Sequence, residues 1–267
     1  MILRHGDVGQ QVMLLQQKLI ATGAKIEADG WFGDATEKAV VRFQKQAGLF
    51  VDGIAGEATV AALDPVYPSE IASKSLTEKD IKAAAKKLGV QVAAIKAVTE
   101  IESRESGFLP SGRPVILFER HIMYRRLLPS ERAHNAVSFP GIVNRKPGGY
   151  VGGEGEWRRL RRACGIHEPT AIESASWGLF QIMGFHWRSL GYESAQKFYH
   201  KMILSEGEQL EAFVRFIKQD SHLHKALKDR DWPDFAERYN GPAYAKNQYD
   251  TRLAAAYQRH REIGRIS

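Results

Sequence analysis

The chain has 267 residues, of which 43% are hydrophobic and 26% are charged. This composition is typical of a globular protein, and the length suffices for one large domain or for a small domain followed by a medium one. No apolar run approaches the roughly 20 residues that a membrane-spanning helix needs. A single cysteine, Cys164, excludes an internal disulfide framework and fits a reducing compartment.

The net charge of +7 is unevenly distributed. Residues 1–64 hold six Lys and Arg against eight Asp and Glu, so the remainder of the chain has a net charge of +9. A basic body favours a polyanion or an anionic lipid surface as partner, but it equally fits ordinary solubilising charge. The arginine run at 158–162 could bind an anionic polymer or lipid, but we favour its interpretation as a solvated helix face. The stretch Met1–Gly6 lacks the layout of a signal peptide, which predicts a cytosolic protein.

One motif occurs twice near the N-terminus. Residues 29–36 and residues 52–59 both read Asp-Gly-x-x-Gly-x-x-Thr, at an interval of 23 residues. Asp-Gly favours a tight turn, and the Thr stands near a helix start. Apolar residues at helical spacing precede and follow each copy. The pattern predicts three short helices joined by glycine turns.

This repeat, together with the Gly6-x-x-Gly9-x-x-Val12 pattern and Leu15-Gln16, resembles the peptidoglycan-binding domain type 1 family. The resemblance covers nearly all of residues 3–64. It implies a first domain at 1–64 that binds cell wall and does no chemistry, with Asp29, Trp31 and Asp52 as binding residues. The alternative is a helical dimerisation or spacer domain.

A linker is predicted at 65–76, where Pro65 and Pro68 disfavour helix. Thr77 and Asp80 form a helix N-cap, and Gly89 ends that helix. Helical patterns dominate the second domain, 77–267, apart from a β-rich run at 113–119 that predicts a small hairpin. The predicted fold class is therefore mainly α (α+β).

Two carboxylates, Glu100 and Glu102, stand at the C-terminal end of a strongly apolar helix pattern at 90–101. Burial and the negative end of the helix dipole both raise the pKa of a carboxyl there. A glycosidase needs such a shift to keep its general acid protonated near neutral pH. Residues two apart lie about 200° around a helix, so only one of the two can face a given cleft. We favour Glu102, which Ser103 follows, over Glu100; the alternative is that both are exposed helix-end carboxylates.

Three short motifs in this order resemble the lysozyme superfamily. Glu102-Ser103 resembles the catalytic glutamate motif of goose-type lysozymes and soluble lytic transglycosylases. Residues 176–182 resemble its Gly-Leu-x-Gln motif, and residues 238–241 resemble the Tyr-Asn-Gly segment of transglycosylases. Residues 118–121 and the layout of 75–264 resemble the N-acetylmuramidase domain of modular phage endolysins. The resemblance implies a lysozyme-like helical domain, with Glu102 as the acid and with substrate bound by Ser176, Gly178, Gln181, Tyr239 and Asn240.

The sequence departs from the goose-type pattern after Ile182, where those enzymes hold a water with acidic residues. Met183 stands there, and a thioether cannot do this. Glu119 and Glu173 remain as second carboxylates. Whether water or the substrate's own hydroxyl attacks therefore stays open at this point.

No cofactor or metal is predicted. His222 and His224 are the only close histidine pair, no His-Glu-x-x-His occurs, and Cys164 has no partner cysteine. The predicted partner is bacterial peptidoglycan, without nucleic acid or stable membrane insertion, and the chain is expected to be a monomer.

These observations predict an endolysin that cuts between N-acetylmuramic acid and N-acetylglucosamine during host lysis. It would leave the host cytoplasm for the periplasm and cell wall when lysis begins. Two alternatives remain: a lytic transglycosylase on the same fold, and a non-catalytic wall-binding phage structural protein.

Overall fold

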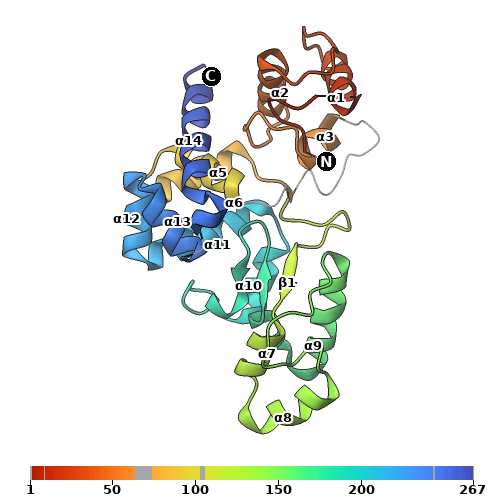
Figure 1. Cartoon of the computed structure of the whole chain (residues 1–267), viewed down its shortest axis with the longest axis vertical. Coiled ribbons are helices and arrows are strands. Elements are labelled where there is room, and N and C mark those ends of the chain that lie inside the picture. The colour runs from red at the N-terminus through yellow and green to blue at the C-terminus, as the bar shows by residue number, and fades with distance from the viewer. Residues whose placement is uncertain (1, 9, 64–73, 103–105, 243, 267) are drawn as a thin grey trace. The chain divides into compact units, whose positions relative to one another are not determined.

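The computed structural model describes residues 2–8, 10–63, 74–102, 106–242 and 244–266. Ser103 and most of the predicted linker lie outside these residues. Two compact units emerge, one comprising residues 1–106 with 220–267 and the other residues 107–219 (Figure 1). Within the described residues, no helix combines the length and the apolar character that crossing a bilayer requires.

The N-terminal part of the first unit contains the three helices that the repeat predicts. They are α1 (Gln10–Ala21), α2 (Asp34–Gln46) and α3 (Glu57–Leu63). Leu15, Leu19, Phe32 and Val40 belong to their shared core. The chain start is fixed to the second repeat, because Leu3 and Ala55 exchange two backbone hydrogen bonds of 3.1 and 2.8 Å.

Each copy of the repeat folds around a buried glutamine. In the first copy the Gln16 amide nitrogen donates to Asp29 Oδ1, to the Trp31 carbonyl and to Thr36 Oγ1, at 2.7 to 2.9 Å. Its Oε1 accepts from the Gly30 amide at 2.8 Å. The turn and the following helix are therefore held to α1 by one side chain.

The second copy uses Gln44 of α2 in the same way. Its amide nitrogen donates to Asp52 Oδ1, to the Ile54 carbonyl and to Thr59 Oγ1, while its Oε1 accepts from the Asp52 and Gly53 amides. The motif's Asp and Thr thus serve as partners of a glutamine that precedes the motif. Sequence reasoning found the turns but not these two glutamine contacts.

The rest of the first unit is helical. Its elements are α5 (Glu78–Leu88), α6 (Val92–Glu102), α12 (Ser221–Asp229), α13 (Trp232–Asn240), the 3-10 turn η2 (Tyr244–Asn247) and α14 (Tyr249–Ile266). The cap predicted for α5 is confirmed, with Thr77 and Asp80 forming a capping box and Gly89 adopting a left-handed C-cap. The apolar helix α6 packs against α5 and α14, and α14 also packs against α13. The last residues of α6 and α13 are thereby brought together.

The second unit is built around a three-stranded antiparallel sheet in the order β1–β2–β3. The strands are β1 (Ile116–Phe118), β2 (Ala175–Trp177) and β3 (Ile182–Met183). The small hairpin that the sequence predicts is present, and it joins β2 to β3 through Gly178–Gln181. The β-rich run at 113–119 supplies β1, which pairs with β2 far along the chain, and its Pro114 also forms an antiparallel bridge with Phe108.

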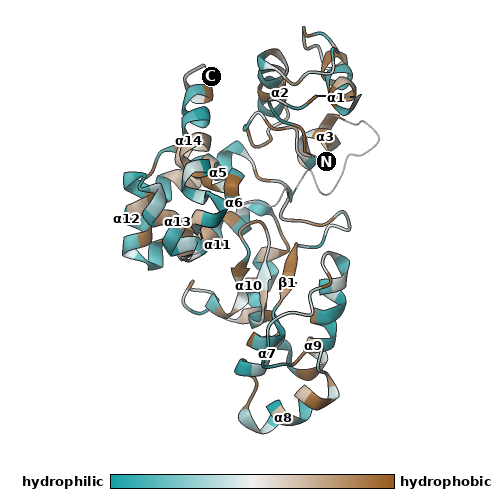
Figure 2. Cartoon of the chain, viewed as in Figure 1, coloured by the Kyte–Doolittle hydropathy of each residue, from teal (hydrophilic) through white to brown (hydrophobic). Residues whose placement is uncertain are grey.

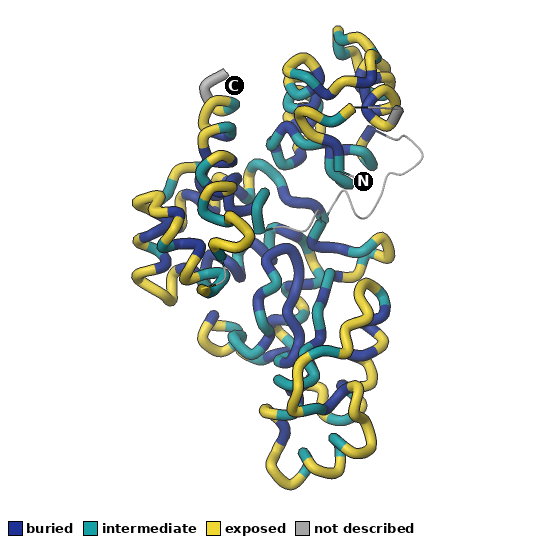
Figure 3. The backbone as a smooth tube through the Cα atoms, viewed as in Figure 1, coloured by how far each residue is buried: buried dark blue, intermediate teal, exposed yellow. Residues whose placement is uncertain are grey.

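Helices surround this sheet. They are α7 (Arg120–Arg126), α8 (Pro129–Ser138), α9 (Glu154–Glu173), α10 (Ala195–Met202) and α11 (Glu206–Gln219), with the 3-10 turn η1 (Gly184–His186). The hydrophobic strand β1 (Figure 2) and the buried strand β2 (Figure 3) form the centre of the unit. Trp177 is fully buried, with edge-on ring contacts to Trp157 and Phe198. Trp157 and Trp177 are therefore core residues.

Replacing Gln44 with alanine should destabilise the N-terminal helices. The substitution removes Gln44 from five hydrogen-bonding groups, of which the Thr59 hydroxyl and the Gly53 amide are in buried contacts and the other three in part-buried ones. A buried group that loses its partner costs about 1–3 kcal/mol. Because water can satisfy some of these groups, we expect a loss of about 3 kcal/mol or more in local stability. Amide hydrogen exchange of residues 34–63 measures this loss. Gln46→Ala, at the end of the same helix, should change exchange little; equal protection in both variants would contradict the role of Gln44.

Candidate functional site

Glu102 is the last residue of α6 and lies half-buried beside the end of α13. Its Oε1 accepts a hydrogen bond of 2.9 Å from the side-chain amide of Asn240. Burial raises the pKa of the Glu102 carboxyl, and this effect outweighs the Asn240 hydrogen bond and the charge of Arg252, which both lower it. The side chain is thus a carboxyl that tends to hold its proton.

Glu100, two residues earlier, has the opposite environment. Arg259 donates to its Oε1, and His260 Nε2 lies 2.9 Å from its Oε2. Burial favours a raised pKa here too, but the hydrogen bonds and charges of His260 and Arg259 prevail and lower the pKa of Glu100. Glu100 is therefore a charged residue that joins α6 to α14, and Glu102 has the properties of an acid.

Tyr239 and Asn240, both predicted to bind substrate, flank the same carboxyl. Tyr239 stacks on Phe235 of α13 with ring centroids 5.7 Å apart. Burial and the negative charge of Glu102 raise the pKa of Tyr239 well above its ordinary value. Its phenol consequently stays neutral. The structure thus brings together Glu102, Tyr239 and Asn240, which stand far apart in the sequence.

The residues predicted to bind substrate in the second unit brace the β2–β3 hairpin. Ser176 is buried and donates to Gln181 Oε1 at 2.7 Å, while the Gln181 amide donates to the Gly178 carbonyl at 2.7 Å. Gln181 itself adopts a positive φ of 50°. These contacts hold the turn closed on itself, so the amide of Gln181 already has partners within the protein.

Gly178 was expected to let a sugar approach closely, but its surroundings give a different reason for glycine. Its φ is +69°, and a Cβ there would overlap the side chain of Gln209. The buried Gln209 accepts from the Leu179 amide at 2.7 Å and donates to the Met202 carbonyl at 3.0 Å. A Cβ on Gly107 would overlap the same side chain. Sequence reasoning missed Gln209, which lies in an ordinary amphipathic helix pattern.

The two further carboxylates differ in how many of their oxygens have partners. Glu119 makes its side-chain contacts through Oε2, which accepts from the Tyr150 hydroxyl at 2.8 Å and lies 3.0 Å from His121 Nδ1. Glu173 accepts from Trp187 Nε1 through Oε1 and from Arg126 Nε through Oε2, both at 2.7 Å. Glu173 therefore connects α7, α9 and the segment after η1, whereas both of these contacts of Glu119 with described residues fall on Oε2.

Asp29 and Trp31 line an open hollow of about 600 Å³ in the N-terminal helices. Trp31 is 61% exposed, which is unusual for so large an apolar side chain. Hydrogen bonds from Trp31 and Gln16 lower the pKa of Asp29, so this carboxylate is charged at neutral pH. Lys25, Glu27 and Asp34 also line the hollow.

Asp52, at the same place in the second copy, does not share this environment. Burial raises its pKa to about 7, although Ile54 and Gln44 donate to it just as Trp31 and Gln16 do to Asp29. Ile54 replaces the exposed tryptophan. The two copies therefore share the same turn and the same glutamine contacts, but the open hollow beside an exposed tryptophan belongs to the first copy.

No cluster of three or more metal-ligating side chains occurs within the residues that the structure describes. His224 instead contacts the Leu88 carbonyl through Nε2 at 2.7 Å.

Comparison with known families identifies both parts of the chain. The N-acetylmuramidase family model matches residues 91–261, and the peptidoglycan binding domain family model matches residues 8–63. The chain belongs to the N-acetylmuramidase family. The second part of this muramidase is a lysozyme-like glycoside hydrolase module, and the first is a peptidoglycan-binding module.

The muramidase is also similar to a solved structure, the endolysin of Burkholderia phage AP3. The sequences are 47% identical, the TM-score is 0.91, and the match covers 98% of this chain and 100% of the other. This agreement extends the resemblance over both modules. It supports assigning the chain to modular phage endolysins that hydrolyse peptidoglycan.

Two curated relatives share a shorter segment with the muramidase. An N-acetylmuramoyl-L-alanine amidase of Bacillus licheniformis is 49% identical over 65 residues, covering 23% of this chain and 18% of that protein. A zinc D-Ala-D-Ala carboxypeptidase of Streptomyces albus G is 48% identical over 60 residues, covering 21% and 24%. The muramidase thus spans about a fifth of the length of these relatives, and their amidase and peptidase activities are not transferred to it.

The opposite environments of the two glutamates should be visible by NMR. In pH titrations of side-chain ¹³C shifts, Glu102 should titrate above and Glu100 below the ordinary glutamate value. Asn240→Ala removes a hydrogen bond that favours the charged form, so the pKa of Glu102 should rise further. Asn247→Ala, an exposed change in η2, should leave it unchanged. A fall in the Glu102 pKa on Asn240→Ala would contradict this account.

Proposed function

We propose that Glu102 is the general acid of this muramidase and that it cleaves the bond between N-acetylmuramic acid and N-acetylglucosamine. The observation that carries the proposal is the contrast within α6, where burial raises the pKa of Glu102 while Arg259 and His260 lower that of Glu100. A carboxyl whose pKa is raised keeps its proton to a higher pH and can give that proton to the glycosidic oxygen as the bond breaks.

In this mechanism Asn240 orients the acid and Tyr239 keeps its surroundings neutral. The Asn240 amide engages Oε1 of Glu102, so that the acidic proton is carried on Oε2. After proton transfer the carboxylate is stabilised by the same hydrogen bond, which is stronger to a charged acceptor. A sugar cation that forms at the anomeric carbon is then captured by water or by a hydroxyl of the substrate.

We propose Glu119 rather than Glu173 as the carboxylate that positions water. Support comes from the hydrogen-bonding capacity of the two carboxylates. Among the described residues, Tyr150 and His121 contact Oε2 of Glu119, while both oxygens of Glu173 accept hydrogen bonds of 2.7 Å. Substituting Glu173 would also break the link between α7 and α9, so its loss would act through stability.

The hollow at Trp31 is proposed as the contact between the binding module and cell wall. An exposed indole offers a flat apolar face for a sugar ring or lactyl methyl, and the charged Asp29 offers a hydrogen-bond acceptor beside it. Asp52, whose pKa burial raises to about 7, is proposed to support the fold instead. The chain would act after synthesis in the host cytoplasm, when lysis gives it access to the wall.

Glu102→Gln should lower cleavage of purified peptidoglycan by at least about 100-fold, because a general acid contributes roughly that much or more. Binding to the wall should be unchanged, since the binding module is intact. Glu262→Gln, an exposed change on α14, serves as the matched control and should retain activity within about twofold. Full activity of Glu102→Gln would refute the assignment and direct attention to Glu100.

The masses of the products distinguish the two reaction outcomes in the same digests. Fragments with reducing ends indicate capture by water, and fragments lighter by one water indicate a lytic transglycosylase. The second outcome has a specific reason to be tested, because Met183 stands where goose-type enzymes hold an acid. Glu119→Gln should remove activity only if water is the nucleophile.

Trp31→Ala should weaken binding of the full chain to purified wall by about tenfold, as expected for a single aromatic contact of about 1.4 kcal/mol. The rate of cleavage of short soluble glycan fragments should not change. Ile54→Ala is the matched variant at the equivalent place of the second copy and should have little effect. An equal loss in both variants would show that binding does not depend on the first copy.

A further inference from the structure

The positive charge of the chain is concentrated in one segment of the second unit. Residues 120–166 contain ten Lys and Arg against three Glu, a net charge of +7, which equals that of the whole chain. Two of the three glutamates are already paired: Glu156 with Arg159 inside the unit, and Glu154 with Arg113. The outward-facing charge of this segment is therefore almost entirely cationic.

The same segment carries an α-helix that packs on little. None of the ten residues of α8 is buried, and α8 lies at one end of the unit, mostly exposed in Figure 3. Its position is held by polar contacts, in which Arg132 donates to the Leu127 and Arg125 carbonyls. Yet large apolar side chains are exposed in α8 and directly beside it: Val137 within the helix is 84% exposed, and its flanking residues Leu128 and Phe139 are 63% and 44% exposed. Several apolar side chains exposed in one place are unusual on a surface that has no partner.

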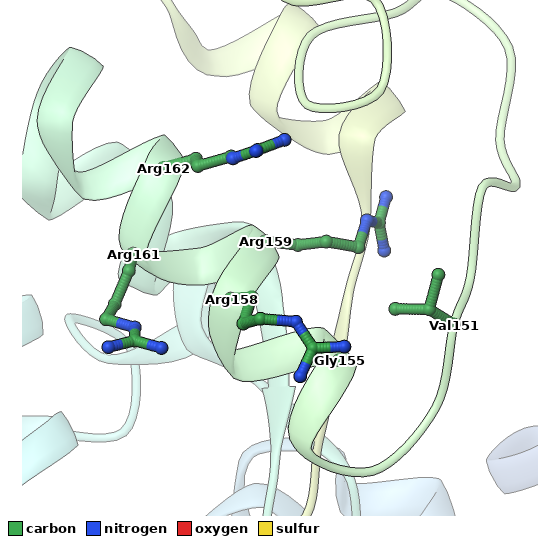
Figure 4. Close-up of a pocket in the computed structure, with 6 residues that line it drawn as sticks. All are labelled: Val151, Gly155, Arg158, Arg159, Arg161 and Arg162. Carbon is green, nitrogen blue, oxygen red and sulfur yellow. The ribbon is translucent and has the colours of Figure 1, made fainter.

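Two adjoining hollows connect Phe139, at the end of α8, with arginines of α9. One of about 950 Å³ is lined by Phe139, Ile142, Val151 and Arg162 among others. The other, of about 580 Å³, is lined by Val151 again with Arg158 and Arg162. In Figure 4, Arg158 and Arg162 extend from α9 on the side of the loop that carries Val151. Apolar and cationic groups thus share one continuous surface.

The loop on this surface has a fixed shape. The amides of Val151 and Gly152 donate to Glu156 Oε1 at 2.7 and 3.1 Å, and Arg120 donates to the Lys146 and Pro147 carbonyls. These bonds tie the stretch 146–152 to the start of α9 and to α7. Val151 is therefore presented to solvent by a braced backbone.

We propose that α8, the 139–151 loop and the outer side of α9 form a docking surface for an anionic lipid bilayer. Val137, Phe139 and Val151 would enter the head-group boundary, and Arg158 and Arg162 would pair with lipid phosphates. Exposed apolar groups flanked by Lys and Arg are the combination that interfacial binding uses. A nucleic acid or a wall polyanion would require the arginines but would gain nothing from exposed Val137 and Phe139. The contact is peripheral and independent of the reaction proposed for Glu102.

Co-sedimentation of the full chain with lipid vesicles tests the charge requirement. The chain should bind vesicles of phosphatidylethanolamine and phosphatidylglycerol, but not vesicles of phosphatidylcholine alone. The double variant Arg158→Gln with Arg162→Gln should bind about 20-fold more weakly, because each basic residue contributes roughly fivefold near an anionic surface. Arg159 is left intact, since it pairs with the buried Glu156. The matched control Lys197→Gln with Lys218→Gln removes the same charge from α10 and α11, and it should change binding less than twofold.

The need for exposed apolar side chains distinguishes binding to a lipid bilayer from binding to a soluble polyanion such as DNA. Val137→Ser with Phe139→Ser should lower vesicle binding about tenfold and leave retention of a DNA duplex unchanged, while Leu204→Ser on another surface should alter neither. Peptidoglycan cleavage and thermal unfolding of each variant verify that it is folded. Failure of the wild-type chain to bind anionic vesicles would overturn the proposal. Vesicle binding that is insensitive to the Val137 and Phe139 changes would do the same and would indicate a general polyanion surface instead.

Discussion

A buried polar group must find a hydrogen-bond partner, and this requirement organises both units of the chain. Gln16 and Gln44 supply the partners for the turns of the repeat, and Gln209 does so for the strands' hairpin. In the second unit Glu156 accepts from the Phe118, Val151 and Gly152 amides, and Arg159 donates to the Phe118 carbonyl. Each of these side chains reaches across elements that are distant in sequence. The backbone of each turn is therefore specified by a side chain elsewhere.

The helix that ends at Glu102 illustrates how the same requirement separates two chemically identical groups. Burial alone acts on both Glu100 and Glu102 in one direction. What distinguishes them is the number and charge of the donors that face them: a cation and an imidazole for Glu100, and a neutral amide for Glu102. The helical offset of two residues is what delivers the pair to different neighbours. A carboxyl with a raised pKa and a carboxyl with a lowered pKa thus arise within a single helical turn.

Much of the fold could be predicted from local patterns. The three N-terminal helices, the capping box of α5 and the buried character of α6 follow from residue spacing and cap chemistry, and motif order indicated the lysozyme-like module. The sheet was harder, because β1 and β2 are three-residue strands that are separated in the sequence by α7, α8 and α9. For the candidate site, helix geometry could nominate Glu100 or Glu102, but the donors that separate them come from α13 and α14. The packing reason for glycine at 178 could not be predicted, because Gln209, the side chain that a Cβ would meet there, lies about 30 residues away with no local signal. The substrate-binding roles of Gly178 and Gln181 stay predictions.

The duplicated turn of the binding module has a consequence for how such a module can diverge. Each copy contains its own glutamine, so the stability of the scaffold does not depend on what the outer face of either turn displays. Ile54 stands in the second copy where the exposed Trp31 stands in the first, and both copies have the same glutamine contacts. The glutamine contacts that position 31 shares with position 54 are made by its backbone carbonyl and not by its side chain. A change of the Trp31 side chain can therefore alter the outer surface of the first turn while the contacts that hold the turn stay in place.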